Sequence, residues 1–235
     1  TVFKILKKKD KNKLSYFNQI IKLLIQIQSI KHRKVKNFRN QNYTIPKYDK
    51  KILINEANLF CDWYAKNNLS KLRKKRFCKN FKKIIKELTL KLKLKDNIFV
   101  HRDFHVSNLM SVKNQIGLID SQDALIGNKA YDLASLIDDV RLKTSYQFKE
   151  KIFKFYTKKQ KNLDIKKFKN DFEILSVLRN LKIIGIFTRL ALRDRKKNYL
   201  RLIPYTWQLI NMRIDQNQTF IDLKNLLSQN FKWIK

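Results

Sequence analysis

The sequence contains few residues that break regular structure: three glycines and two prolines in 235 residues. This scarcity argues against a turn-rich β-sandwich or barrel. Cys61 and Cys78 are the two cysteines, too few for a disulfide framework, so we expect a protein of the reducing cytoplasm. The sequence also lacks a run of about 18 apolar residues, so we expect a soluble protein without a membrane partner.

Acidic residues are scarce beside basic ones. The chain has 19 Asp and Glu against 54 Lys and Arg, which gives a formal net charge of +35. A basic surface attracts phosphates, so binding of RNA or another polyanion is one interpretation. However, the lysines are scattered along the chain and accompany abundant Ile, Asn and Phe, a set that AT-rich codons favour. We therefore interpret the charge mainly as compositional and do not expect a nucleic acid partner.

Apolar periodicity predicts helices over most of the chain. Hydrophobic residues make up 43% of the sequence, as in globular proteins. We expect a loop at Lys31–Lys51, where Pro46 interrupts a basic stretch, and a helix capped by Ser70. Periodic apolar residues predict the other helices at 14–30, 52–65, 132–142, 146–156, 165–192, 199–212 and around Leu226.

The period changes near the middle of the chain. Ile98–Val100 and Ile116–Ile119 are short apolar runs beside Asn, Gly and Asp, which is typical of buried strands. We expect the two runs to form one small strand pair whose loops carry polar groups. The predicted fold class is therefore mostly α (α+β), helical with a small strand pair.

Three oxygen-bearing side chains follow these runs. Asp103 and Asn108 come after the first run, and Asp120 ends the second. A loop carboxylate can take a proton from an attacking hydroxyl, while Asn and Asp oxygens suit Mg²⁺. These are the polar groups that catalyse phosphoryl transfer in kinases. The alternative is a surface Asp paired with a neighbouring cation.

Other polar residues of this region are open to more than one interpretation. Asp123 is either an extra acidic group or a turn residue, and Asp132 either caps a helix or bonds back to the loop. His101 and His105 have a spacing compatible with zinc, but no third soft ligand is evident. We expect His101 to pack beneath the loop instead. Three arginines are weaker candidates for contact with an anionic substrate: Arg141, Arg189 and Arg193.

Three motifs together resemble the aminoglycoside phosphotransferase and choline kinase superfamily, relatives of the protein kinases. They are HRDFHVSNLM, IGLIDSQDA and AYDLASLIDD. With ILINEANLFCDWY and LRNLKIIGIFTRLALRDRKKNYL, the pattern is similar to bacterial anomeric sugar kinases that act on N-acetylmuramate and N-acetylglucosamine. The resemblance covers most of the chain and implies an ATP-dependent, Mg²⁺-dependent kinase of a sugar or amino sugar.

The resemblance also implies roles for individual residues. Asp103 would be the catalytic base, and His101 and Arg102 would be the other catalytic residues. Asn108 and Asp120 would bind Mg²⁺ and the nucleotide phosphates. The remaining implied roles are structural support by His105 and Asp132, and substrate contact by Asp62, Trp63, Tyr64 and Asp123.

The sequence departs from the family pattern in several places. Ser121 stands where an aromatic residue is usual, and Val106 and Asn128 stand where proline is frequent. Family members also carry an N-terminal lobe with a phosphate-covering loop and a lysine. We expect residues 1–6 to be the remnant of that lobe and residues 7–235 to be the kinase-like C-terminal lobe. On this hypothesis the chain is a fragment with little activity alone.

Two other hypotheses remain beside the kinase. One is a non-catalytic basic helical protein that binds RNA or another polyanion. The other is a degenerate kinase used as a scaffold, which Ser121 favours and which the retention of Asp103, Asn108 and Asp120 opposes. The acceptor and the oligomeric state cannot be predicted from these motifs.

Overall fold

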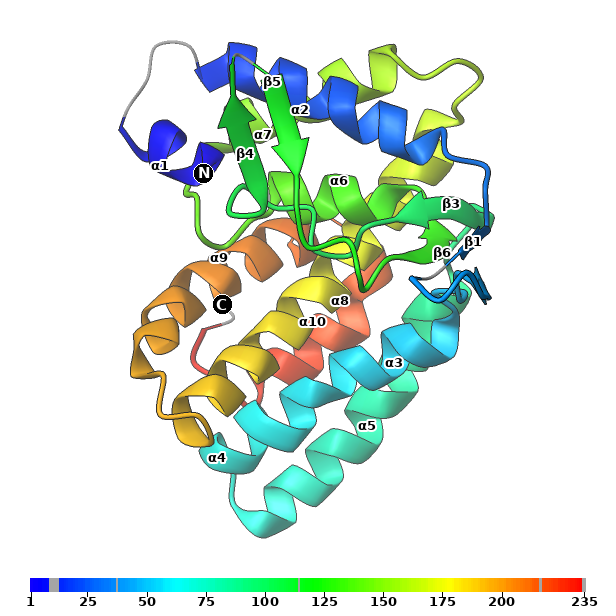
Figure 1. Cartoon of the computed structure of the whole chain (residues 1–235). Coiled ribbons are helices and arrows are strands. Elements are labelled where there is room, and N and C mark those ends of the chain that lie inside the picture. The colour runs from blue at the N-terminus through cyan, green and yellow to red at the C-terminus, as the bar shows by residue number, and fades with distance from the viewer. Residues whose placement is uncertain (9–12, 37, 114, 216, 234–235) are drawn as a thin grey trace. The chain divides into compact units, whose positions relative to one another are not determined.

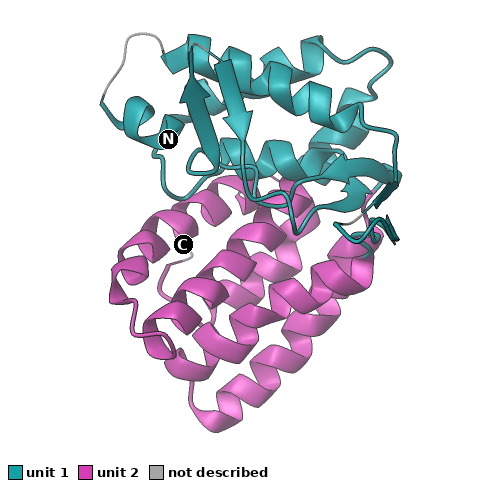
Figure 2. Cartoon of the chain, in the orientation of Figure 1, with its two compact units in different colours: residues 1–49, 93–172 teal, residues 50–92, 173–235 magenta. Residues whose placement is uncertain are grey.

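The fold consists of helices with short antiparallel strand pairs (Figure 1). The computed structural model describes residues 1–8, 13–36, 38–113, 115–215 and 217–233. The chain divides into two compact units (Figure 2). We call residues 1–49 and 93–172 the loop-bearing unit, and residues 50–92 and 173–235 the helical unit. Within the described ranges, no helix combines the length and apolar character needed to cross a bilayer.

The loop-bearing unit contains all the strands that are described. Its strands are β1 (Lys34–Lys36), β2 (Asn42–Thr44), β3 (Asp96–Val100), β4 (Leu109–Val112), β5 (Gln115–Leu118) and β6 (Leu125–Asn128). Its helices are α1 (Val2–Lys7), α2 (Lys13–Gln28), α6 (Ala130–Ile137), α7 (Tyr146–Lys158) and the first residues of α8 (Ile165–Leu192). The helices α2 and α7 agree with the periodicity of the sequence, because their apolar residues recur on one buried face. Helix α8 differs, since from residue 171 onward it is buried on most of its surface.

The strand pairing differs from the single pair that we expected. β3 pairs with β6, and β4 pairs with β5, both antiparallel. The two runs recognised in the sequence, which form β3 and β5, therefore belong to different pairs. The partners were missed because β4 (LMSV) and β6 (LIGN) are four residues long and show no clear alternation.

The segment Lys31–Lys51, expected as a loop, contains the hairpin of β1 and β2. Both strands are exposed on both faces, so no hydrophobic alternation marks them in the sequence. Beyond the hairpin, Tyr48 donates its backbone N–H to Ile126 in β6 at 2.7 Å. A Cβ at Gly127 would lie 2.8 Å from the Cβ of Tyr48, so this close approach requires glycine.

The helical unit packs its helices around an aromatic core. Its elements are α3 (Lys50–Leu59), the π-helix η1 (Phe60–Ala65), α4 (Lys66–Asn68), α5 (Lys71–Leu90), the rest of α8, the 3₁₀-helices η2 (Lys197–Leu202) and η3 (Gln218–Phe220), α9 (Ile203–Ile214) and α10 (Ile221–Ser228). Phe60 stacks on Phe81 at 5.5 Å and meets Trp207 and Phe231 edge-on. At Gly185 of α8, a Cβ would lie 2.4 Å from the backbone of Leu59, so glycine lets the two helices touch.

Candidate active site

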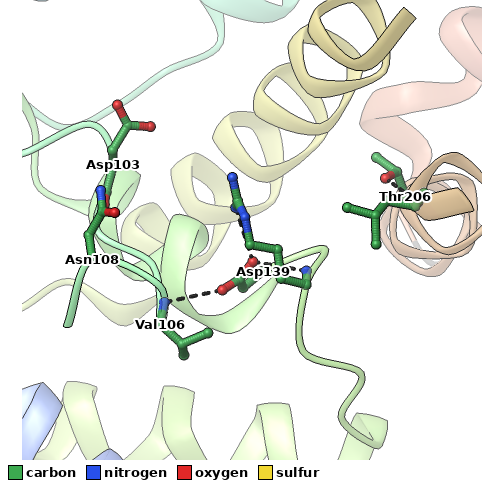
Figure 3. Close-up of polar contacts among 7 residues, drawn as sticks. Asp103, Val106, Asn108, Asp139 and Thr206 are labelled. Atoms are coloured by element: carbon green, nitrogen blue, oxygen red, sulfur yellow. Dashed lines mark hydrogen bonds and ion pairs between the residues drawn. The ribbon is translucent and has the colours of Figure 1, made fainter. Parts of the chain in front are cut away.

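The loop between β3 and β4, residues 101–108, carries the predicted catalytic base, and we call it the catalytic loop for that prediction. Phe104 and Val106 are fully buried, whereas Asp103 between the strand end and these anchors is exposed. The backbone turns tightly, since His105 N–H donates to the Asp103 carbonyl at 2.9 Å and Asn108 N–H donates to the His105 carbonyl at 3.0 Å. The alternation of buried and exposed residues therefore projects the Asp103 carboxylate from a fixed backbone (Figure 3).

Asn108 lies between the two loops that bear the candidate residues. Its side-chain amide nitrogen donates to the Asp103 carbonyl at 3.2 Å, a bond that does not use the amide oxygen. Its backbone carbonyl accepts a hydrogen bond from Ile119 N–H at 3.1 Å, and Ile119 directly precedes Asp120. The structure thus ties Asp103, Asn108 and the Asp120 segment together through short bonds.

Asp120 is exposed and has a φ of 63°, in the left-handed region. Non-glycine residues adopt this conformation rarely, and strain of this kind clusters at functional sites. The donor chemistry of the site is an amide oxygen from Asn108 and a carboxylate from Asp120. Two hard oxygen ligands fit Mg²⁺, which keeps its other positions for water and phosphate oxygens.

His101 lies beneath this site. Its ring is completely buried, and its Nε2–H donates to the Ile119 carbonyl at 3.1 Å. Burial lowers the pKa of His101, while the nearby carboxylates of Asp103 and Asp120 oppose that shift. His101 is therefore neutral at pH 7, and it links the catalytic loop to the residue that precedes Asp120.

Asp132 of α6 binds the start of the catalytic loop. Its buried carboxylate accepts from His101 N–H at 2.7 Å and from Arg102 N–H at 3.0 Å. Arg102 has a φ of 72°, a left-handed conformation that these bonds help to hold. Asp132 lies within the helix and does not cap it, since α6 begins at Ala130.

The Arg102 side chain turns toward neighbouring segments. Its guanidinium donates to the Asp123 carbonyl at 3.2 Å and lies 5.3 Å from the centre of the Tyr48 ring. Asp123 itself is exposed and lies within a turn in which Ala124 N–H donates to the Ser121 carbonyl. Arg102 thus connects the catalytic loop to the Asp123 segment. The contact with Tyr48 had no signal in the sequence.

The predicted substrate residues Asp62, Trp63 and Tyr64 belong to η1 of the helical unit. Tyr64 is buried in the aromatic core, and its hydroxyl accepts from Trp233 Nε1–H at 3.0 Å. Burial raises the pKa of Tyr64. Asp62 is exposed and Trp63 is half-buried, so these two side chains are the more accessible ones. The remaining predicted residue, His105, is buried in the loop-bearing unit.

One buried carboxylate at the site was not predicted. Asp139 accepts from Val106 N–H, in the middle of the catalytic loop, at 3.1 Å. The available signal was its position seven residues after Asp132, which corresponds to two turns of a helix. The predicted helix extended to residue 142, whereas α6 ends at Ile137 and the chain turns through Asp138 and Asp139.

Comparison with known proteins gives a consistent set of matches. Residues 8–162 match the model of the phosphotransferase enzyme family, named APH. The chain is 32% identical over 166 residues to an N-acetylmuramate/N-acetylglucosamine kinase of Neisseria meningitidis serogroup B, covering 68% of the chain and 50% of that protein. It is 30% identical over 190 residues to the kinase of the same name from Pseudomonas aeruginosa, covering 78% of the chain and 56% of that protein.

Solved structures with a similar fold are also kinases. An ethanolamine kinase of Plasmodium vivax matches with a TM-score of 0.57 and 14% identity, covering 85% of the chain and 58% of that structure. An amicoumacin kinase matches with a TM-score of 0.53 and 13% identity, covering 83% of the chain and 57% of that structure. The predicted mostly helical, kinase-like fold is therefore confirmed. The chain spans about half the length of the curated relatives it matches.

Proposed function

Since the chain belongs to the phosphotransferase enzyme family, we propose that it carries the catalytic and metal-binding loops of a kinase that phosphorylates a hydroxyl group of a small molecule. One observation supports this proposal above all others. Asn108 donates to the Asp103 carbonyl with its side chain and accepts from Ile119, the neighbour of Asp120, with its backbone. A candidate base and two candidate metal ligands are thereby held on connected loops.

In this proposal each residue has a distinct task. The exposed carboxylate of Asp103 accepts the proton of the acceptor hydroxyl as that oxygen attacks the γ-phosphorus of ATP and the bond from this phosphorus to the leaving ADP breaks. Asn108 and Asp120 would hold Mg²⁺ through their side-chain oxygens. When bound, ATP supplies the phosphoryl group and Mg²⁺ neutralises charge on the phosphates. His101 stays neutral and keeps the two loops at a fixed separation through Ile119.

The acceptor in the proposal is a sugar or amino sugar. Relatives about 30% identical to the chain are named N-acetylmuramate/N-acetylglucosamine kinases, which favours acceptors of this class. Among the predicted contact residues, Asp62 and Trp63 offer accessible side chains for such a ligand, and Asp123 is exposed beside Arg102. We place the reaction in the cytoplasm, where ATP is available.

We further propose that the nucleotide-clamping part of the whole protein lies outside residues 7–235. The three glycines stand singly at Gly117 in β5, Gly127 in β6 and Gly185 in α8. None of these positions forms the glycine-rich loop with which kinases cover nucleotide phosphates. Residues 7–235 would then contribute catalysis and metal binding, with residues 1–6 as the end of the other lobe.

The decisive experiment measures phosphorylation of N-acetylmuramate, N-acetylglucosamine and other sugars by the whole protein with ATP and Mg²⁺. Replacing Asp103 with Asn should lower kcat by about 1000-fold, because the amide cannot accept the proton. The matched control is Asp164→Asn, since Asp164 is also exposed in the loop-bearing unit and its carboxylate pairs with Lys167 at 3.1 Å. Full activity of Asp103→Asn, or equal losses in both variants, would contradict the proposal.

The alternative of polyanion binding has one specific observation in its favour. Helix α5 carries nine basic residues among 20 and a single acidic one, Glu87. Arg73 and Arg76 line a hollow of about 260 Å³ together with residues at the end of α10. A steep fall of RNA affinity with salt, without any nucleotide binding and unaffected by Asp103→Asn, would favour this alternative over the kinase.

A further inference from the structure

The catalytic loop has few strand hydrogen bonds of its own, so other groups must hold its backbone. Asp132 holds the N–H groups of His101 and Arg102 at the start of the loop. The tight turns from Asp103 to Asn108 satisfy the N–H groups of His105 and Asn108 locally. Val106 lies within these turns, three residues after Asp103 and two before Asn108.

Both backbone groups of Val106 are bonded to distant segments. Its N–H donates to Asp139 Oδ2 at 3.1 Å, across 33 residues of sequence. Its carbonyl accepts from Phe3 N–H at 3.1 Å. The side chain of Val106 is completely buried. The backbone of Val106 is therefore held through both its N–H and its carbonyl, and the carboxylate of Asp139 is the charged partner in these two bonds.

Asp139 is itself held in place. Its carboxylate is about 1% exposed, and Oδ1 accepts from Arg141 N–H at 3.0 Å and lies 3.4 Å from the Arg141 guanidinium. Figure 3 shows the carboxylate reaching Val106, while the Asp103 side chain extends away from that bond. One oxygen thus accepts from the catalytic loop and the other accepts from the turn after α6, so both oxygens of the buried carboxylate have hydrogen-bond donors.

We propose that Asp139 is a positioning residue of the active site, which fixes the separation of the base Asp103 from the metal ligand Asn108 by holding the Val106 peptide. The proposal rests on the kinase function proposed above. Asp132 in the first turn of α6 and Asp139 just after its end both bind the catalytic loop, so α6 and the turn that follows it are a common support of this loop. Asp132 sets the start of the loop and Asp139 its middle.

The first test measures the loop directly and needs no substrate. Amide hydrogen exchange of residues 101–108 in the 235-residue chain is compared between the wild type, Asp139→Ala and Asp139→Asn. We expect exchange at Val106 at least about tenfold faster in Asp139→Ala, with Asp139→Asn intermediate because its amide retains one acceptor oxygen. Exchange in α8 reports global opening and serves to normalise the values.

The matched control is Asp138→Ala. Asp138 is equally buried and adjacent, but its carboxylate pairs with Lys149 at 3.2 Å. This variant should lose stability and leave the normalised exchange at Val106 at the wild-type value. If Asp139→Ala fails to fold, Asp139→Asn provides the same comparison. Unchanged exchange at Val106 in a folded Asp139 variant, or equal acceleration in Asp138→Ala, would overturn the proposal.

The second test measures kinetics in the whole protein. We expect Asp139→Ala to lower kcat by about 10- to 100-fold and to change the acceptor KM by less than about threefold, since the base is misplaced while the acceptor contacts remain. Asp139→Asn should recover part of kcat. A purely structural Asp139 would reduce the amount of folded enzyme without changing kcat per folded molecule, and that result would defeat the proposal. If the wild type phosphorylates no acceptor while exchange at Val106 responds as expected, the proposed function fails and the holding of the loop by Asp139 stands.

Discussion

The loop-bearing unit and the helical unit bury different chemistry. In the described part of the loop-bearing unit, the buried ionisable side chains include His101, Asp132, Asp139, Lys149 and Asp171. In the helical unit the interior centres on Phe60, and its buried charged residues are Arg179 and Arg213 within the described ranges. The difference follows from backbone geometry. Helices satisfy their own peptide groups, whereas buried loops need side chains to do so.

The two interiors also differ in what a substitution removes. A buried carboxylate such as Asp171 accepts from Lys93 N–H, Leu94 N–H and the Asn128 side chain. Removing it leaves donors without acceptors, and the cost falls on polar groups. Removing an aromatic ring from the helical unit leaves a cavity instead, and the cost falls on apolar contacts. Substitutions to alanine in the two units therefore distinguish stabilisation by buried hydrogen bonds from stabilisation by apolar packing.

The largest expected effect on stability lies in the helical unit. Phe60→Ala should lower the free energy of unfolding by about 4 kcal/mol, because the ring is fully buried among other aromatic rings. Denaturant unfolding measures the loss. Phe60→Leu is the control, since it retains much of the volume and should cost clearly less. Equal losses in both variants would show that packing around Phe60 is not what stabilises the unit.

A slightly smaller effect is expected in the loop-bearing unit. Asp171→Ala should cost about 3 kcal/mol, because it leaves the N–H groups of Lys93 and Leu94 without their acceptor at the entry to β3. Asp171→Asn retains one acceptor oxygen and should cost less. The same unfolding measurement applies. A loss below about 1 kcal/mol for Asp171→Ala would mean that water replaces the carboxylate, and the contrast between the units would weaken.

The smallest expected effect is a dependence of stability on pH. Burial lowers the pKa of His101 below its usual value of 6.5 in the folded state. The unfolded chain therefore takes up a proton at His101 first as the pH falls, so the contribution of neutral His101 to stability is fully present above pH 6.5 and declines below it. Unfolding at pH 7.5 and 5.5 for the wild type and His101→Gln measures this contribution. An identical decline in both proteins would assign it to other groups.

Local patterns were sufficient to predict most helices and the chemistry-bearing residues. The bounds of α8, Ile165–Leu192, are those that the sequence predicted. Asp103, Asn108 and Asp120 were identified because each follows or ends a short apolar run. Their proposed roles remain predictions that the Asp103 experiment addresses.

Strand partners and loop supports could not be predicted in the same way. The pairing of β3 with β6 joins residues about 25 to 32 positions apart. The missed strands β4 and β6 have four residues each, too few to show an alternation of apolar and polar residues. The contact between Cys61 and Cys78 could not be predicted either. They are 17 residues apart in sequence, yet a hydrogen bond between the two thiols contributes, after burial, to raising the pKa of Cys61.

The amino-acid sequence by itself determined a mostly helical, basic chain with one dense set of oxygen-bearing residues between Asn97 and Asp139. These features follow from local periodicity and from the chemistry of single side chains. Only the tertiary structure decided that His101 bonds to Ile119, that Asp132 and Asp139 hold the backbone of the catalytic loop, and that Arg102 turns to Asp123. Such contacts depend on which buried peptide groups lack a partner in their own element, and that is settled only when the chain has folded.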